Sequence, residues 1–327
     1  AFTGTITGLQ FTDVITATYA SAGAPATAGI GNYPITTALV DPGNRLSNYT
    51  VNVSVGTLTV SPRALTVTPA DKTKIYGDVF TLFTGTITGI QNGEAITATY
   101  SSPGAVATAT VAGSPYPITA VLNAPAGVLA NYSIILNTGD LAVTLRTLVV
   151  TPDNKAKVFG TTFSAFTGVV TGLQAGDVIT PVYASTGAPP AAPVGTYPIT
   201  VTLTDPGGRL PNYAVTLNQG TLTVGLSVLT VTANNQTKVY GDPDPAFTFT
   251  YAGFVGTDTP AVLDTPPACQ VAVPHNNIGT FPITCSGGID DNYVFTYVPA
   301  TLTITPRAIT VTPDNQTKIY GDVFTAF

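Results

Sequence analysis

Hydrophobic and polar side chains alternate along the chain in short runs with a period of two. In the segment 118–122, for example, Ile118, Ala120 and Leu122 fall on one face, and the residues between them fall on the other. This is the period of a β-strand with one buried face. Glycine, proline and asparagine interrupt the runs, as turns between strands require. The pattern therefore predicts an all-β protein.

One stretch of the chain illustrates how closely the predicted strands follow one another. Its seven strands are predicted at 64–68, 74–76, 83–88, 95–100, 116–122, 132–136 and 141–145. About seven short strands at close, regular spacing are typical of a small antiparallel β-sandwich or barrel, such as an immunoglobulin-like domain. We therefore expect a small antiparallel sandwich here.

Four sequence markers recur in constant order and divide the chain into repeats of about 80 residues. The first is a lysine that opens KIYGD, KVFGT, KVYGD and KIYGD, at Lys74, Lys157, Lys238 and Lys318. The second is an aromatic residue before Pro-Ile-Thr, at Tyr33, Tyr116, Tyr197 and Phe281. The third is an Asn-Tyr pair that begins at Asn48, Asn131, Asn212 and Asn292. The fourth is an alternating strand, GTLTV at Gly56 and Gly220, with related sequences at Asp140 and Ala300.

The markers predict three whole repeats between two partial ones. Residues 62–145, 146–226 and 227–305 form the whole repeats, 1–61 the C-terminal part of a repeat, and 306–327 an N-terminal part. The joining sequences VSPRALTV and ITPRAITV lead almost directly from one repeat to the next, and proline stiffens them. We therefore expect a rod-like array whose partners are neighbouring copies of the same repeat, in one long chain or end to end. Equivalent phenylalanines recur at Phe2, Phe83, Phe166, Phe247 and Phe327, so the two ends of the sequence are expected to be in register.

The segment TVTANNQTKVYGDPDPAFTF, followed by GTFPIT and NYVFTYVPATLTITP, resembles the MBG family (mostly-β, glycine-rich domains) of the Tyr-Gly type. Its turn motif matches at Tyr76-Gly77, Tyr240-Gly241 and Tyr320-Gly321, and departs from the usual form at Phe159-Gly160-Thr161. The resemblance implies a tandem array in a large bacterial surface or secreted protein, often adhesin-like, and therefore an extracellular location. It implies no catalytic residue, so we expect neither an enzyme nor a cofactor.

Composition excludes some classes of partner. Only 9% of residues are charged, the net charge is −6, and no basic run exists, so the electrostatic footprint of a nucleic-acid-binding protein is missing. No apolar run approaches the length of a membrane span. The sequence contains no methionine, which indicates an excerpt, so targeting signals cannot be judged from it.

The cysteines and the single histidine offer little chemistry. Cys269 and Cys285 are expected to form a disulfide, as a lone pair in a secreted β protein would. A zinc site made of these two residues and His275 lacks a fourth ligand and the usual spacing, and we reject it. His275 is expected to be a solvated loop residue.

Carboxylates suggest structural roles more than catalysis or metal binding. One acid per repeat recurs after a glycine turn, at Asp13, Glu94, Asp177 and Asp258, and is expected to accept hydrogen bonds from turn amides. Four further acids lie in predicted loops of the repeat 227–305, at Asp242, Asp244, Asp290 and Asp291. Calcium binding there is an open alternative, but no calcium-loop motif appears and rigid turns are preferred.

A covalent crosslink is a further hypothesis. Each repeat contains a lysine, an asparagine and an acid, such as Lys74, Asn131 and Glu94, which are the ingredients of a spontaneous isopeptide bond. An asparagine before tyrosine is equally a turn former.

These observations lead to two functional hypotheses. The first is a structural protein that forms a rigid fibre, filament or adhesin stalk on a bacterial surface. The alternative is an adhesin module that binds a glycan or a host protein through the loops of the divergent repeat 227–305, the one with the cysteine pair.

Overall fold

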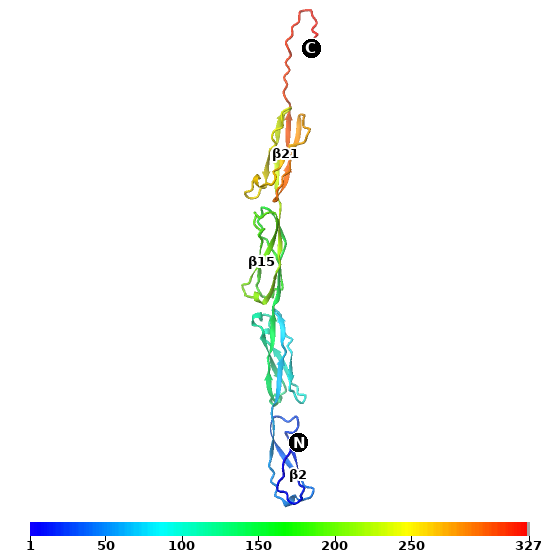
Figure 1. Ribbon diagram of the computed structural model, residues 1–327, viewed down its shortest axis with the longest axis vertical. Helices are drawn as coiled ribbons and strands as arrows, with labels where there is room; N and C mark the ends of the chain where they lie inside the picture. Colours follow the sequence, from blue (N-terminus) through cyan, green and yellow to red (C-terminus); the bar gives the residue numbers. More distant parts are fainter. Residues whose placement is uncertain (326–327) are drawn as a thin grey trace. The chain divides into compact units, whose positions relative to one another are not determined.

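The computed structural model of the chain describes residues 1–325 and confirms the all-β class (Figure 1). The expected register of Ala326 and Phe327 lies outside these residues. Contacts divide the chain into two compact units. Unit 1 comprises Ala1–Leu148, Gly172–Ile179 and Asp205–Thr216, and unit 2 comprises Val149–Thr171, Thr180–Thr204 and Leu217–Phe327.

Unit 1 begins with an antiparallel sheet of three strands in the order β1-β2-β3. These are β1 (Thr16–Ser21), β2 (Gly31–Val40), which is labelled in Figure 1, and β3 (Gly56–Val60), with a 3₁₀ turn, η1 (Leu46–Asn48), between the last two.

The repeat 62–145, also in unit 1, contains the seven strands that the sequence predicts. They are β4 (Arg63–Pro69), β5 (Lys72–Ile75), β6 (Gly85–Thr88), β7 (Thr97–Ser101), β8 (Tyr116–Asn123), β9 (Tyr132–Leu136) and β10 (Gly139–Thr144). They form one sheet in the order β6-β4-β9 and a second in the order β5-β10-β8-β7. Three short 3₁₀ helices that the sequence reading missed connect them: η2 (Pro103–Ala105), η3 (Val111–Gly113) and η4 (Val128–Asn131).

The prediction of purely antiparallel pairing is wrong, because both sheets are mixed. β4 pairs with β9 in parallel, and β5 pairs with β10 in parallel. The physical reason is that β4 and β5 are two parts of one nearly continuous run, as are β9 and β10. Each run leaves one sheet and enters the other, so the first and last runs of the repeat pair side by side. Hairpin counting along the sequence does not reveal such a distant pairing.

Unit 2 repeats this arrangement. Its sheets have the orders β12-β17-β15-β14, β20-β18-β23 and β19-β24-β22-β21, and β11 pairs antiparallel with β13. The strands are β11 (Arg146–Pro152), β12 (Lys155–Val158), β13 (Gly168–Thr171), β14 (Thr180–Ala184), β15 (Gly195–Thr204), β17 (Gly220–Gly225), β18 (Ser227–Ala233), β19 (Gln236–Val239), β20 (Phe249–Ala252), β21 (Ala268–Val271), β22 (Gly279–Ser286), β23 (Tyr293–Val298) and β24 (Ala300–Thr305). The 3₁₀ helix η6 is Pro260–Val262, while η5 (Leu210–Asn212) and most of β16 (Tyr213–Leu217) belong to unit 1.

The buried side chains of the repeat 227–305 come from both of its sheets. In the repeat 227–305, Val231 of β18 packs in one cluster with Ile283 of β22 and Leu302 of β24, and all three are fully buried. Alternate residues of β18 therefore point at the other sheet, as the period of two predicts. Each such buried side chain stabilises the fold by about 1.5–3 kcal/mol.

The helices found within residues 1–325 are 3₁₀ turns of three or four residues, and none could cross a membrane.

Candidate functional site at the joints between repeats

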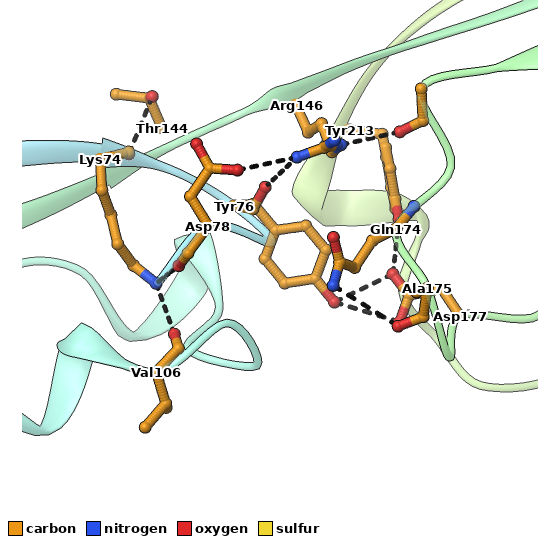
Figure 2. A network of polar contacts seen from close by, with 11 residues as sticks. Lys74, Tyr76, Asp78, Val106, Thr144, Arg146, Gln174, Ala175, Asp177 and Tyr213 are labelled. Carbon is orange, nitrogen blue, oxygen red and sulfur yellow. Dashed lines mark hydrogen bonds and ion pairs between the residues drawn. The ribbon is translucent and has the colours of Figure 1, made fainter. Parts of the chain in front are cut away.

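Two of the repeat markers, the Tyr-Gly turn and the Asn-Tyr pair, meet where one repeat contacts the next, and we call such a contact region a joint. In the first joint, between repeats 62–145 and 146–226, Tyr76 is almost fully buried and its ring packs edge-on against Tyr213, with centroids 5.5 Å apart (Figure 2). Both phenols donate to Asp177, Tyr213 at 2.5 Å and Tyr76 at 3.0 Å. The two hydroxyls thus satisfy one carboxylate whose side chain is only 10% exposed. All these residues belong to unit 1.

The recurring acid of each repeat forms the same chain of two hydrogen bonds, which runs from a backbone N–H through a tyrosine hydroxyl to the carboxylate. The tyrosine of the Asn-Tyr pair accepts a hydrogen bond from a backbone N–H and donates its own proton to the acid. The donor–acceptor pairs are Tyr49–Asp13, Tyr132–Glu94, Tyr213–Asp177 and Tyr293–Asp258, and the backbone donors are Gln10, Gln91, Gln174 and Val255. The predicted structural role is therefore consistent with the geometry, but the expected partner is wrong. The acidic side chain accepts a hydrogen bond from the tyrosine hydroxyl, because the tyrosine lies between the acid and the turn amide.

Burial and the nearby carboxylate change the acidity of these phenols. Burial, with the hydrogen bond to Asp177, raises the pKa of Tyr213 to about 12. Burial and the hydrogen bond to Asp258 raise the pKa of Tyr293 to about 12. The pKa of Tyr76 is also raised, chiefly by burial. Ionising any of these phenols would place a second negative charge beside the acid.

An arginine joins the two sides of the first joint. Arg146 donates through Nη1 to the carbonyl of Tyr76 at 3.2 Å and to Asp78 at 3.1 Å, and through Nε to the carbonyl of Gly172 at 2.9 Å (Figure 2). The ion pair with Asp78 is partly exposed, so it stabilises the joint by about 0–1 kcal/mol. The three bonds together fix where the Tyr-Gly turn lies.

The contact between repeats explains why the Tyr-Gly motif requires glycine. Gly77 has φ +89°, which favours glycine, and an added Cβ would lie 2.3 Å from Oε1 of Gln174 in the next repeat. In the second joint, between repeats 146–226 and 227–305, Gly160 has the same φ, and a Cβ there would lie 2.4 Å from Val255. A side chain at this position would therefore collide with the neighbouring repeat.

The recurring lysine closes the Tyr-Gly turn from inside its own repeat. Lys74 is buried, and its ammonium donates to the carbonyls of Asp78 and Val106 (Figure 2). Lys157 is buried in the same way against the carbonyls of Thr161 and Pro189. Burial lowers the pKa of both lysines. Each lysine ties the turn to a loop at the same end of the repeat.

The asparagine of the Asn-Tyr pair reaches into the preceding repeat. Its side-chain oxygen accepts a hydrogen bond from a backbone N–H about 100 residues earlier in the chain. The pairs are Asn131–Ile30 at 3.1 Å, Asn212–Val111 at 2.8 Å and Asn292–Val194 at 2.9 Å. Asn212 is only 3% exposed, so its amide is committed to this contact. This hydrogen bond, which we call the asparagine clasp, thus recurs at three successive contacts between repeats.

Around the residue that precedes the turn glycine, the second joint is built from apolar contacts, and it lies within unit 2. Phe159 replaces the tyrosine and packs edge-on against Tyr293, with centroids 5.6 Å apart. Phe254 contacts the same tyrosine ring, also at 5.6 Å. Phe159 has no hydroxyl to donate, and Asp258 accepts from Tyr293, at 2.6 Å. Val255 completes this cluster.

The residues of the isopeptide hypothesis have separate partners. Lys74 binds the two carbonyls named above, Glu94 accepts from Tyr132, and Asn131 accepts from the backbone of Ile30. The geometry thus gives each of them a non-covalent role, and a crosslink among them stays a hypothesis that intact mass would test.

In the repeat 227–305, His275 lies in the loop between the two strands that carry the cysteines. Cys269 and Cys285 form the expected disulfide across β21 and β22. The expectation that His275 is solvated is wrong. Its ring is buried, with Nε2 2.9 Å from Asp244 and Nδ1 3.2 Å from the carbonyl of Ala272. Asp244 also binds Lys238, at 2.7 Å, and these contacts lower the pKa of Asp244.

The other acids of the repeat 227–305 serve as local partners. Asp242 pairs with Arg307, and Asp290 accepts from the backbone N–H groups of Asn292 and Tyr293. Within residues 1–325, no cluster of three or more histidine, cysteine or acidic side chains is arranged to hold a metal ion. Calcium binding stays an untested alternative.

Sequence reasoning found the markers but missed that they meet. The strongest missed signal is numerical. Tyr76 and Asp177 are 101 positions apart, as are Val111 and Asn212. This separation exceeds the length of one repeat by roughly a strand and a turn, so each pair joins two successive repeats. Arg146 and Gln174 were not singled out at all, although each occupies a recurrent position.

Solved structures similar to the chain include several multidomain β proteins. One is the I9–I11 tandem of titin, with 12% identity, 74% of this chain and 100% of that chain covered, and a TM-score of 0.23. Another is domains 1–6 of the surface layer protein SbsC, with 15% identity, 86% and 45% coverage, and a TM-score of 0.22. A third is a SusE-like surface polysaccharide-binding protein of Bacteroides thetaiotaomicron, with 11% identity, 89% and 54% coverage, and a TM-score of 0.18. The chain thus spans about half the length of the last two, and scores this low support no functional argument.

No curated protein sequence matches the chain. The repeated sheets and joints nevertheless define a class, a tandem β-repeat protein. The MBG domain family (YGX type) matches residues 65–142, 148–223 and 229–303. The chain belongs to this family, as its Tyr-Gly turns predicted.

Proposed function

We propose that this chain is a structural segment of an extracellular array on a bacterial surface, in which immunoglobulin-like β-sandwich repeats form a rigid, rod-like stalk or fibre. The observation that carries the proposal is the joint itself. Tyr76 is buried against Asp177 and Tyr213 of the next repeat, and Asn212 accepts from Val111 of the repeat before. The membership in the MBG family and the disulfide support the location.

The proposed role is mechanical and non-enzymatic. A hydrogen bond to a charged group stabilises by about 1.5–3 kcal/mol, and a neutral one by about 0.5–1.5 kcal/mol. The first joint combines bonds of both kinds with an edge-to-face ring pair, which adds about 0.5–1.5 kcal/mol. Contacts of this strength would oppose bending at the joint, where a flexible linker would allow it.

Small-angle scattering and electron microscopy of the purified chain test this proposal. We expect elongated particles of uniform length for the natural chain. Replacing Tyr76 and Asn212 together by alanine should produce particles bent at the first joint. Tyr183→Phe is the matched control, because it alters a tyrosine of β14 that lies outside the joints. Compact particles for the natural chain would overturn the proposal.

The alternative function is ligand binding by an adhesin module through the loops of the repeat 227–305. The observation that favours it is the cluster of Lys238, Asp244 and His275 beside the disulfide loop, since charged side chains gathered under a loop can fix a polar ligand. Saturable binding on a glycan array or to a host-cell extract, lost in His275→Ala, would support this function. Absence of saturable binding by the natural chain would reject it.

A further inference from the structure

The two whole joints share the asparagine hydrogen bond and the Tyr–Asp pair, but they differ in chemistry at four facing positions around the Tyr-Gly turn. We call the Tyr-Gly turn of a repeat its outgoing end, and the surface that the next repeat presents to that turn the incoming face. In the first joint the outgoing end carries Tyr76 and Asp78, and the incoming face carries Arg146 and Gln174.

The second joint replaces all four of these groups. Its outgoing end has Phe159 in place of Tyr76 and Thr161 in place of Asp78. Its incoming face has Ser227 in place of Arg146 and Val255 in place of Gln174. The second joint therefore lacks the tyrosine hydroxyl, the Arg–Asp ion pair and the glutamine amide of the first joint. Instead, Phe254 packs on the ring of Tyr293.

The other outgoing ends and incoming faces keep the polar residues. The outgoing turns at Tyr240 and Tyr320 end in aspartate, and the faces of the repeats 1–61 and 62–145 carry Gln10 and Gln91. One outgoing end deviates, and the incoming face that deviates is the one it contacts. A change confined to one side would leave an arginine or a glutamine facing apolar side chains, which costs free energy.

We propose that the joints form two matched types, polar and apolar, and that these facing residues determine which repeat can follow which. The residues act by pairing, as in other interfaces where an unmatched polar group discriminates against the wrong partner. The inference rests on the proposed structural role of the joints and does not depend on where the protein is located.

The proposal assigns a partner to the outgoing end of the repeat 227–305. Arg307 donates through Nε to the carbonyl of Tyr240 at 2.7 Å and pairs with Asp242. Arg146 makes the same two contacts with Tyr76 and Asp78. Tyr240 is 47% exposed, whereas Tyr76 is 1% exposed. The surface around Tyr240 therefore fits a repeat of the polar type, with a glutamine, an acid and a tyrosine on its incoming face.

Two double-mutant cycles in the full chain test the matching. The first introduces Thr161→Asp and Ser227→Arg, singly and together. Hydrogen exchange of amides beside the joint, such as those of Gly160 and Ser227, is the readout, because each is hydrogen-bonded within its own repeat next to the facing residues. We expect the double variant to exceed the product of the single effects by about two- to five-fold, as an exposed ion pair would give, and the excess to vanish at high salt.

The second cycle combines Val255→Gln with Phe159→Tyr. Val255→Gln alone should lower protection at the second joint, because it places an amide among Phe159, Phe254 and Tyr293. Phe159→Tyr should restore part of the loss by bringing a hydroxyl to that amide and to Asp258. Gln174→Val in the first joint is the reciprocal control and should also lower protection.

Additive effects in both cycles would overturn the matching. A gain in protection from Ser227→Arg alone that equals the gain of the double variant would also overturn the matching. Because the cycles compare variants of one chain, additive effects alongside elongated particles would reject the matching and leave the proposed structural role standing. Compact particles would reject that role.

Discussion

The hydroxyl of Tyr213 lies 2.5 Å from the carboxylate of Asp177, and Tyr76 of the preceding repeat donates to that same carboxylate. One acid thus serves its own repeat and its neighbour. This carboxylate thus forms a polar link between two successive repeats.

Removal of one hydroxyl should measure that link. Tyr76→Phe keeps the ring against Tyr213 and loses the bond to Asp177, so we expect the free energy of unfolding to fall by about 1–2 kcal/mol in urea denaturation. Tyr183→Phe is the control. The hydroxyl of Tyr183 is buried and has no hydrogen-bond partner within residues 1–325, so its loss should be neutral or slightly stabilising. Equal effects of the two variants would contradict the assigned role of Tyr76.

The Tyr-Gly glycine should tolerate no side chain. Gly77→Ala combines a positive φ with a collision against Gln174, so we expect it to destabilise the first joint by more than about 1 kcal/mol. Gly93→Ala separates the two causes, because Gly93 has φ +70° but no atom within 4 Å of the added Cβ. Thermal unfolding should show a clearly larger loss for Gly77→Ala, and adding Gln174→Ala should recover part of it. A loss no greater than that of Gly93→Ala would show that the neighbouring repeat does not matter.

Alkaline pH should loosen the joints. The pKa of Tyr213 is raised to about 12, so the folded state holds this proton more tightly than the unfolded state does. The resulting stability is fully present below the ordinary tyrosine pKa of about 10 and is lost as pH rises through about 12. Tyrosinate absorbance should show Tyr213 and Tyr293 among the last phenols to ionise, together with a fall in stability over this window. Tyr213→Phe should reduce that fall, and an unchanged alkaline profile would refute the assignment.

The asparagine clasp should matter more than other asparagines. Asn212→Ala leaves the N–H of Val111 without its acceptor inside the joint, and we expect a loss of about 1–3 kcal/mol. Asn218→Ala removes an exposed amide that bonds Thr151 and should cost less than about 1 kcal/mol. Exchange of the Val111 amide should accelerate in the first variant and stay unchanged in the second. Slow exchange of that amide in both would contradict the clasp.

The disulfide should stabilise the repeat 227–305 alone. Replacing Cys269 and Cys285 together by serine, or reducing them, should lower the free energy of unfolding by about 3 kcal/mol on the loop-entropy model. Calorimetry should show one transition shifted and the others unchanged. A uniform shift of all transitions would mean that stability is shared through the joints.

The strands could be predicted from the sequence because each depends on a local pattern. The alternation around Ile118 places it in the core, and it is fully buried in β8. The parallel pairing of β4 with β9 could not be predicted from the sequence, because it joins strands almost seventy residues apart and leaves no local pattern. The boundaries predicted for the whole repeats 62–145, 146–226 and 227–305 and for the partial repeats 1–61 and 306–327 stay predictions.

The site was predictable only as separate residues. Tyr76, Asn212 and Asp177 each stood in a recurrent position, but a repeat read alone assigns all three to turns of their own domain. Their partners belong to the adjacent repeat, and burial of Tyr76 arises only when that repeat is in place. His275 was misjudged for a related reason, because Asp244, which holds it, is 31 positions away and looks like part of a rigid turn.

The matched joints also bear on how such an array could lengthen by gene duplication. A tandem copy of 62–145 would set Tyr76 and Asp78 against the face that carries Arg63 and Gln91, which is of the polar type. A tandem copy of 146–226 alone would set Phe159 and Thr161 against Arg146 and Gln174, which are not their partners. The repeats 146–226 and 227–305 would therefore have to be copied as a pair, whereas the repeat 62–145 could be copied alone.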